Sequence, residues 1–302
     1  MSAHAATSSM QQAPTTQSPL ARETALPVPS RIGAAFAAAK AEGRTALIPF
    51  VTAGYPNLAM TEQLIPALVR GGADLIEIGV PFSDPLADGA TVQRASQAAL
   101  ANGVRLADCL PLVERLRARH GVQVPLLLMG YYNPILQYGP DRFAADAAEA
   151  GVDGFIVPDL PTEESDELLA ACRAHGRDLI FLLAPTSTEA RIADVAARAS
   201  GFVYCVSLRG VTGARQQLPD LEEYVGRVRR ATNLPLAIGF GVSTAEHVRQ
   251  VGMVADGAVV ASALINHLER LPESEQPAAA EAFVRALGEP SGRPNEESKS
   301  EG

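Results

Sequence analysis

The sequence predicts an α/β fold, a (β/α)8 TIM barrel with an additional N-terminal helix. Eight short apolar runs alternate with helical stretches over about 240 residues, which is the strand count of this barrel. The runs do not alternate apolar with polar residues, so they are typical of parallel strands that are buried on both faces. The alternative is a doubly wound open sheet, but the GxGxxG motif expected after its first strand is absent.

Each apolar run predicts one strand of the barrel. In chain order the predicted strands are Ala46–Val51, Leu75–Ile78, Pro125–Met129, Gly154–Val157, Leu179–Leu183, Phe202–Val206, Leu236–Ile238 and Ala258–Val260. Helical segments fill the gaps between these runs, as the alternation of this fold requires.

Three of the predicted helices have recognisable starting points. Ser30–Glu42 precedes the first strand, and we expect it to close the floor of the barrel. Thr162–Ala174 and Ser243–Val251 each open on a hydroxyl residue. A side-chain oxygen at this position accepts a hydrogen bond from the first turn, so the opening residues are the expected N-caps of these two helices.

The two ends of the chain differ in composition from its middle. Residues 1–28 are rich in Ala, Ser, Thr, Gln and Pro, which predicts a disordered N-terminal tail. A transit peptide is the alternative, but it would be rich in arginine, and this segment has only Arg22. Residues 288–302 predict a disordered C-terminal tail, which leaves residues 29–287 as the barrel and catalytic domain.

Composition excludes several classes of function. The net charge of −9 argues against nucleic acid or an anionic membrane as the main partner. No apolar run is long enough to span a bilayer. Cys109, Cys172 and Cys205 are far apart, which predicts reduced, buried thiols in a cytoplasmic protein. The five histidines show no ligand spacing, so no metal is expected.

Two acidic residues near the end of the second predicted strand are candidates for acid–base chemistry. Glu77 lies within the apolar stretch ADLIEIGVP, where a carboxylate is costly unless it is paired or used. Asp88 follows on the loop PFSDPLADGA and can fold back over the strand end. Burial of Glu77 would raise its pKa, as suits a group that both gives and takes a proton. The alternatives are a structural glutamate and an ordinary turn-forming aspartate.

Small residues follow the seventh and eighth predicted strands, where TIM barrels commonly bind phosphate. These segments are GFGVST, from Gly239 to Thr244, and ASAL, from Ala261 to Leu264. Their backbone N–H groups could approach an anion, although ordinary tight turns are the alternative. The polar segment SLRGVTGAR, which follows the sixth strand, is placed where a lid would be, or it is a surface loop.

These stretches resemble the tryptophan synthase alpha chain family from residue 31 to about residue 270. The matching segments are IPFVTAGYP, ADLIEIGVPFSDPLADG, YYNPI, VDGFIVPDLPTEES, SLRGVTGA and IGFGVS. The second segment is the most specific. It places Glu77 eleven residues before Asp88, which lies in PFSDPLADG, and the chain combines this segment with GVTG and GFG. One departure is Ala261-Ser262, where the family usually has Gly-Ser, and the added methyl group restricts the backbone that would hold the phosphate.

The resemblance implies a lyase of tryptophan biosynthesis that cleaves indole-3-glycerol phosphate to indole and glyceraldehyde 3-phosphate. It implies that Glu77 protonates indole C3 and that Asp88 stabilises the resulting cation. The residues implied to line the indole pocket are Phe50, Tyr131, Ile156, Tyr204 and Phe240. Those implied to hold the phosphate are Gly213, Gly241, Ala261 and Ser262, with Gly239 nearby. Position, rather than the resemblance, predicts one more contact: Thr212 follows the sixth strand at the same barrel face as Asp88, so its hydroxyl is expected to donate a hydrogen bond to that carboxylate.

The resemblance also implies a partner. A beta chain that carries pyridoxal phosphate would receive the indole in an alpha2-beta2 heterotetramer, and this chain would carry no cofactor. Pro81, Asp84 and Pro161 would face that partner. Two other hypotheses stay open: a non-catalytic activating subunit, and another phosphate-binding barrel such as an isomerase or indole-3-glycerol phosphate synthase. The synthase needs a strand lysine, and the predicted strands contain none.

Overall fold

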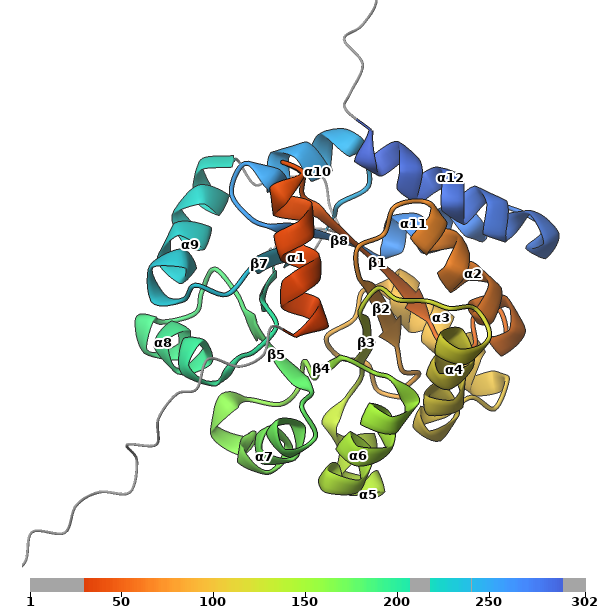
Figure 1. Cartoon of the computed structure of the whole chain (residues 1–302), viewed down its shortest axis with the longest axis horizontal. Coiled ribbons are helices and arrows are strands. Elements are labelled where there is room, and N and C mark those ends of the chain that lie inside the picture. Colours follow the sequence, from red (N-terminus) through yellow and green to blue (C-terminus); the bar gives the residue numbers. More distant parts are fainter. Residues whose placement is uncertain (1–29, 207–217, 240, 290–302) are drawn as a thin grey trace, which may run out of the picture.

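The computed structural model describes residues 30–206, 218–239 and 241–289 of the 302-residue chain. Its centre is a closed barrel of eight parallel strands that pair in chain order (Figure 1). The strands are β1 Ala46–Thr52, β2 Ile76–Gly79, β3 Leu126–Met129, β4 Gly154–Ile156, β5 Asp178–Leu183, β6 Val203–Val206, β7 Leu236–Gly239 and β8 Gly257–Val260. Pairing of β1 with β8 closes the ring, with Ala46 opposite Gly257.

Helices surround the strands. The helices of the described residues are α1 Arg31–Ala41, α2 Leu58–Arg70, α3 Ala90–Ala101, α4 Leu106–Ala118, α5 Tyr132–Tyr138, α6 Pro140–Ala150, α7 Asp166–Ala174, α8 Glu189–Arg198, α9 Leu218–Ala231, α10 Ala245–Gly252, α11 Ser262–Leu268 and α12 Gln276–Gly288, with short 3-10 helices η1 Thr162–Glu164 and η2 Glu273–Glu275. The predicted (β/α)8 fold is therefore confirmed, and each predicted strand end lies within one residue of its observed position.

Helix α1 closes one end of the barrel, as the sequence predicted. It begins after Ser30, whose hydroxyl accepts a hydrogen bond from the amide of Gly33. Ile32 and Phe36 point from this helix into a buried layer to which each barrel strand or its flanking residue contributes a side chain. Figure 1 shows α1 lying across the end of the ring of strands. Helix α1 and this layer therefore fill the interior of the barrel at its N-terminal end.

Two of the predicted helix starts were wrong. Thr162 is not an N-cap, because residues 162–164 form the 3-10 helix η1 and α7 begins only at Asp166. Helix α10 is capped by Thr244 rather than Ser243, since the Thr244 hydroxyl accepts a hydrogen bond from the amide of His247. Ser243 and Thr244 are adjacent hydroxyl residues that are equally able to cap a helix, and the backbone geometry selects Thr244. At Thr162 the cause differs: a separate 3-10 turn precedes α7, and Ser165 before that helix makes no side-chain capping bond.

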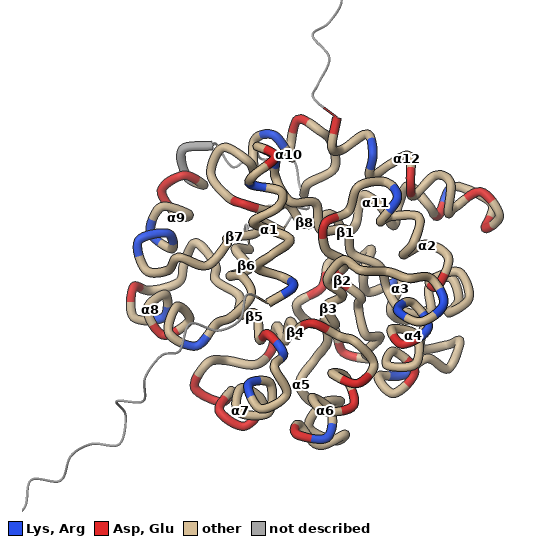
Figure 2. Tube along the Cα trace, in the orientation of Figure 1, with Lys and Arg blue, Asp and Glu red and all other residues tan. Residues whose placement is uncertain are grey.

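Charges lie mainly on the outer helices and connections, with both signs interspersed (Figure 2). Cys109, Cys172 and Cys205 are buried free thiols, as predicted. Within the described part of the chain, no His, Cys, Asp and Glu side chains gather as a group of three or more that could bind a metal. None of the described helices combines the length and apolar character needed to cross a membrane.

Candidate active site

A cavity of about 620 Å³ opens at the C-terminal ends of the barrel strands. It brings together most of the predicted site residues that the structure describes. The predicted residues that line it are Phe50, Glu77, Asp88, Tyr204, Gly239, Gly241, Ala261 and Ser262. They come from β1, β2, β6 and β7 and from the connections that follow β2, β7 and β8, so residues far apart in the sequence meet at one site.

Glu77 lies in the wall of this cavity, on β2 between Phe50 of β1 and Leu127 of β3. Its side chain is only 1% exposed, and its Oε2 atom has no hydrogen-bond partner among the described residues. Burial raises the pKa of Glu77 from 4.5 to about 8, and the nearby charge of Asp88 adds to the shift. Glu77 is therefore a neutral acid at pH 7 with an oxygen free to meet a ligand.

Asp88 reaches the same cavity from the loop between β2 and α3. Partial burial raises its pKa from 3.8 to about 6, while the hydroxyl of Tyr131 beside it acts in the opposite direction. Asp88 is therefore mostly ionised at pH 7. The two carboxyl groups differ in protonation state at the same pH because Glu77 is fully buried and Asp88 is not. Such a difference in surroundings lets one carboxyl group act as an acid while the other remains an anion.

Tyr131 holds the loop that carries Asp88. Its hydroxyl accepts a hydrogen bond from the amide of Ala87 at 2.9 Å, and its ring stacks on Phe82 with 5.0 Å between centroids. Tyr131 does not line the main cavity, but it lines a small adjoining space together with Asp88 and Phe50. The structure thus places Tyr131 behind the carboxylate, where it positions the residue next to Asp88 in the chain.

Two glycines make room for the aromatic walls of the cavity. A Cβ atom on Gly79 would lie 2.3 Å from Cζ of Phe50, and one on Gly239 would lie 2.0 Å from the hydroxyl oxygen of Tyr204. No real Cβ atom approaches so closely, so each ring lies where a side chain on the neighbouring strand would be. Phe50 and Tyr204 can therefore lie flat against the barrel wall.

The far side of the cavity offers backbone N–H groups. Gly241, which precedes α10, has a φ of 75°, in the left-handed region that favours glycine. Ala261 is the residue before α11, and Ser262 begins that helix, so their N–H groups are not used within it. No Lys or Arg is found among the described residues that line the cavity. An anion here would be held by backbone groups and helix N-termini.

The other described residues of the prediction do not line this cavity. Ile156 is fully buried in the layer beneath the cavity, against α1, and does not line it. On the candidate partner surface, Pro81 is buried, Pro161 is half-buried and Asp84 is exposed. Outside the described residues lie Thr212, Gly213 and Phe240.

Sequence reasoning missed several apolar residues of the cavity wall. Met129, Pro158 and Leu182 line it beside the predicted residues. Side chains on a strand alternate between its two faces, so residues two apart share a face. Met129, Pro158 and Leu182 each lie two residues after a buried inward residue, which is Leu127, Ile156 or Ile180. Counting by two from those buried residues would have predicted all three.

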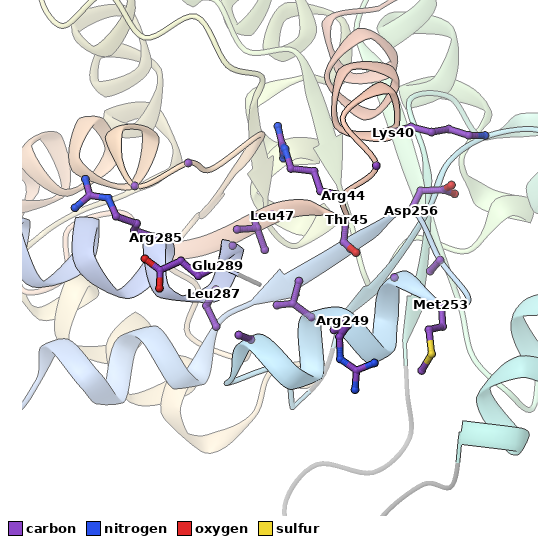
Figure 3. A pocket seen from close by; sticks show the side chains of 18 residues that line it. Lys40, Arg44, Thr45, Leu47, Arg249, Met253, Asp256, Arg285, Leu287 and Glu289 are labelled. Atoms are coloured by element: carbon purple, nitrogen blue, oxygen red, sulfur yellow. The ribbon is translucent and has the colours of Figure 1, made fainter. Parts of the chain in front are cut away.

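Another cavity, of about 950 Å³, lies at the opposite end of the barrel (Figure 3). It contains none of the predicted site residues. Its wall carries several arginines, but Arg44 forms an ion pair with Asp74, and Arg249 pairs with Glu246. Its described carboxylates are the half-buried Asp256, which pairs with Arg229, and the exposed Glu289, so no pair of buried carboxyl groups faces this cavity.

Comparison with known proteins gives one consistent answer. Residues 36–289 match the family model described as the tryptophan synthase alpha chain. The tryptophan synthase alpha chain of Roseiflexus sp. strain RS-1 is 59% identical over 259 residues, which covers 85% of this chain and 99% of that protein. The alpha chain of Chloroflexus aurantiacus is 54% identical, with coverage of 85% and 97%.

Solved structures agree with these relatives. The tryptophan synthase subunit alpha of Legionella pneumophila superposes with a TM-score of 0.80 at 38% identity, covering 86% of this chain and 97% of that one. A chain of Mycobacterium tuberculosis tryptophan synthase superposes with a TM-score of 0.79 at 41% identity, covering 86% and 98%. The similarity therefore extends over nearly the full length of the relatives.

Proposed function

The chain belongs to the tryptophan synthase alpha chain family, and we propose that Glu77 and Asp88 perform the reaction of that family in this protein. The reaction is the retro-aldol cleavage of indole-3-glycerol phosphate to indole and glyceraldehyde 3-phosphate, a carbon–carbon lyase step of tryptophan biosynthesis. One observation carries the assignment of residues: two carboxyl groups face one cavity, with pKa values of about 8 and about 6.

The first step needs an acid and an anion at the same time. Glu77, neutral at pH 7, donates its proton to C3 of the indole ring, which leaves a positive charge on the ring nitrogen. Asp88, ionised at pH 7, accepts a hydrogen bond from the ring N–H and stabilises that charge. Exchanging the two roles would require each group to adopt its less favoured protonation state.

The second step breaks the carbon–carbon bond. Glu77, now a carboxylate, takes the proton from the hydroxyl group on the glycerol carbon that is attached to C3. The C–O bond becomes a carbonyl, and the electron pair of the C3–C bond returns to the ring, which neutralises the ring nitrogen. Indole and glyceraldehyde 3-phosphate leave, and Glu77 is protonated again, so one group serves as acid and then as base.

The substrate is oriented by its two ends. The indole ring would lie against Phe50 and Tyr204, and the phosphate would lie near Gly241, Ala261 and Ser262. Because no described cation lines the cavity, backbone N–H groups would supply the attraction for the phosphate. Thr212 and Gly213 belong to the proposed lid, with Thr212 donating to Asp88, and Phe240 completes the ring contacts.

The partner belongs to the same proposal. A beta chain carrying pyridoxal phosphate would take up the indole within an alpha2-beta2 heterotetramer, while this chain needs no cofactor of its own. The loop between β2 and α3 supports this, because it leaves Leu86 93% exposed beside Asp84 at the catalytic end of the barrel. A leucine so exposed is a candidate for burial against another protein. Three free thiols fit the reducing cytoplasm as the compartment.

The test is indole release by purified variants. Glu77→Gln keeps the shape of the side chain but cannot transfer a proton, so turnover should fall by roughly 10²–10⁴-fold. Glu114→Gln, at an exposed position of α4, is the matched control and should keep wild-type turnover. Asp88→Asn should also be severe, because it removes the negative charge facing the ring. Substantial turnover in Glu77→Gln would show that another group is the acid.

A further inference from the structure

A second cavity lies beside the active site. Its volume is about 190 Å³, and it lies between β1, α2, α11 and the segment that leads into α12. Its lining residues are Phe50, Val51, Thr52, Tyr55, Pro56, Leu64, Leu264, Ile265, Leu268, Glu269, Glu273 and Gln276. Phe50 also lines the active-site cavity, so one aromatic side chain lies between the two spaces.

The size of the cavity limits what it can hold. An apolar cavity of about 150 Å³ holds one benzene molecule, whereas sites for drug-sized molecules have volumes of about 300 Å³ or more. At about 190 Å³ this cavity has room for one or two small rings. Most of its wall is aliphatic or aromatic, with Leu64, Leu264 and Leu268 on the helical side. A flat, mostly apolar molecule fits such a wall.

Two buried polar atoms in the wall have no partner among the described residues. These are Oγ1 of Thr52 and Oε1 of Gln276, on side chains that are 3% and 6% exposed. The amide nitrogen of Gln276 donates to the carbonyl oxygens of Leu268 and Leu271, which fixes the side chain and leaves its oxygen free. That oxygen can only accept, so a ligand that satisfies it must donate a hydrogen bond.

The charges at the cavity exclude anions. Glu269 and Glu273 are part of its lining, and no Lys or Arg is among the described lining residues. Glu269 accepts hydrogen bonds from Tyr55 and Arg94, and Glu273 accepts one from Asn57. Arg94 offsets the charge of Glu269, but Glu273 has only the neutral Asn57 as a hydrogen-bond donor among the described residues, so its negative charge and the apolar wall both disfavour a phosphate group. The phosphorylated substrate and the phosphorylated product are both unsuited to this cavity.

We propose that this cavity is a second binding site, for a neutral planar aromatic molecule with one N–H donor, the chemical class of indole. The N–H group would bond to Gln276 or Thr52, and the ring would pack against Leu264, Leu268 and Phe50. Because Phe50 also forms part of the active-site wall, an occupant holds that wall against Gly79. The proposal does not depend on the catalytic roles of Glu77 and Asp88.

Equilibrium dialysis with labelled indole tests the site in the whole chain. The active site is first saturated with a substrate analogue that carries a propyl phosphate chain and cannot be cleaved. Its phosphate keeps the analogue out of the second cavity. We expect about one equivalent of indole to bind per chain under these conditions. If the analogue abolishes all indole binding, the active site is the only site and the proposal is overturned.

Two leucines provide a matched pair of variants. Leu268→Phe adds volume inside the cavity and should weaken analogue-resistant indole binding at least tenfold. Leu287→Phe makes the same change at a similarly buried leucine that lines the large cavity at the opposite end of the barrel. It should leave indole binding unchanged. Equal effects of the two substitutions would overturn the assignment.

The polar anchor is tested by replacing one of the two polar side chains at a time. Thr52→Val keeps the shape of the side chain and should weaken indole binding by about three- to tenfold if its hydroxyl bonds to the ligand, and Gln276→Met should do the same if its oxygen does. Indene, which has the same shape but no N–H group, should bind both variants as well as wild type. If neither variant discriminates indole from indene, or if a crystal soaked in indole shows only a water molecule between these side chains, no N–H recognition takes place there.

Discussion

Glu77 and Asp88 lie 11 residues apart in the chain and face the same cavity, yet they differ in protonation at neutral pH. The difference follows from surroundings rather than from chemical type. Glu77 is enclosed by the barrel and lacks a partner for one oxygen, whereas Asp88 lies on a loop next to the hydroxyl of Tyr131. Each pKa is raised, but that of Glu77 is raised further, and in the proposed reaction this order would make Glu77 the acid and Asp88 the anion.

The pH dependence of the reaction should therefore be bell-shaped. Below about pH 6, Asp88 becomes protonated and no longer stabilises the cationic ring. Above about pH 8, Glu77 loses the proton that it must donate. We expect kcat/KM to be highest between these values and to decline tenfold per pH unit on either side. A profile that is flat from pH 5 to about pH 9 would contradict the assignment.

The same burial that raises the pKa of Glu77 makes folding depend on pH. Between about pH 4.5 and pH 8 the folded chain keeps this proton and the unfolded chain releases it, so the free energy of unfolding falls as the pH rises through this window. Glu77→Gln cannot ionise, and it should be more stable than wild type by about 2–4 kcal/mol well above pH 8. Below about pH 4.5 the two should unfold alike. Urea unfolding at both pH values measures the difference, and equal stability at alkaline pH would show that Glu77 is well solvated.

Neighbouring strands β6 and β7 are fitted to each other at the active site. Tyr204 of β6 occupies the space above Gly239 of β7, at the end of the strand that leads to the proposed phosphate site. Gly239→Ala should push the tyrosine ring into the cavity and reduce kcat/KM by at least tenfold. In helix α9, a Cβ atom on Gly226 would meet only Nη1 of Arg230, at an ordinary contact distance of 3.8 Å, so Gly226→Ala is the control. Alanine favours the helix by about 0.5–1 kcal/mol, so the control should be fully active and slightly more stable. Full activity in Gly239→Ala would mean that the ring is free to move.

The strands were predictable because their signal is local and strong. Each strand is a continuous apolar run that ends at polar or small residues. Such a run is sufficient to predict a parallel strand that is buried on both faces. The helix start at Ser243 was misjudged because the choice between the adjacent Ser243 and Thr244 depends on the backbone path. The start at Thr162 was misjudged because a separate 3-10 turn precedes α7. The depth of the cavity along the barrel axis was the other feature that could not be predicted. Ile156 lies in the buried layer below the cavity, and the sequence does not show where along the barrel this filled core ends.

The site was predictable only in part from the residues alone. Glu77 can be singled out without any comparison, because a carboxylate buried in an apolar strand is energetically costly unless it is paired or used. Asp88 has no such signal, because Asp-Gly is an ordinary turn sequence, and its selection depended on resemblance to a family. The supporting function of Tyr131 depends on a contact with Ala87 across 44 positions of the chain, which no local pattern encodes.

The molecule as a whole is divided into a structural end and a catalytic end. Helix α1 fills the first, where the ring of Phe36 lies 5.4 Å from that of Phe202. Phe36→Ala should lower the free energy of unfolding by about 3–5 kcal/mol and leave kcat nearly unchanged below the unfolding transition. Phe283→Ala, at a half-buried position of α12, is the control and should cost less. A large loss of kcat in folded Phe36→Ala would show that the two ends are coupled.

The catalytic end also carries the surface proposed for the beta chain. Leu86 is 93% exposed on the same loop as Asp88, so a partner that covers Leu86 also restricts the catalytic loop. Burying a leucine stabilises a complex by about 1.5–3 kcal/mol, and a carboxylate at that position would have to be desolvated. Leu86→Glu should therefore weaken beta-chain binding at least tenfold and reduce activation, while the isolated chain keeps its basal indole release.

Met253, 55% exposed at the opposite end of the barrel, supplies the matched control, and Met253→Glu should bind the partner normally. Titration of each variant with a beta chain, with indole release as the readout, separates the two outcomes. Wild-type binding by Leu86→Glu would place the interface away from this loop.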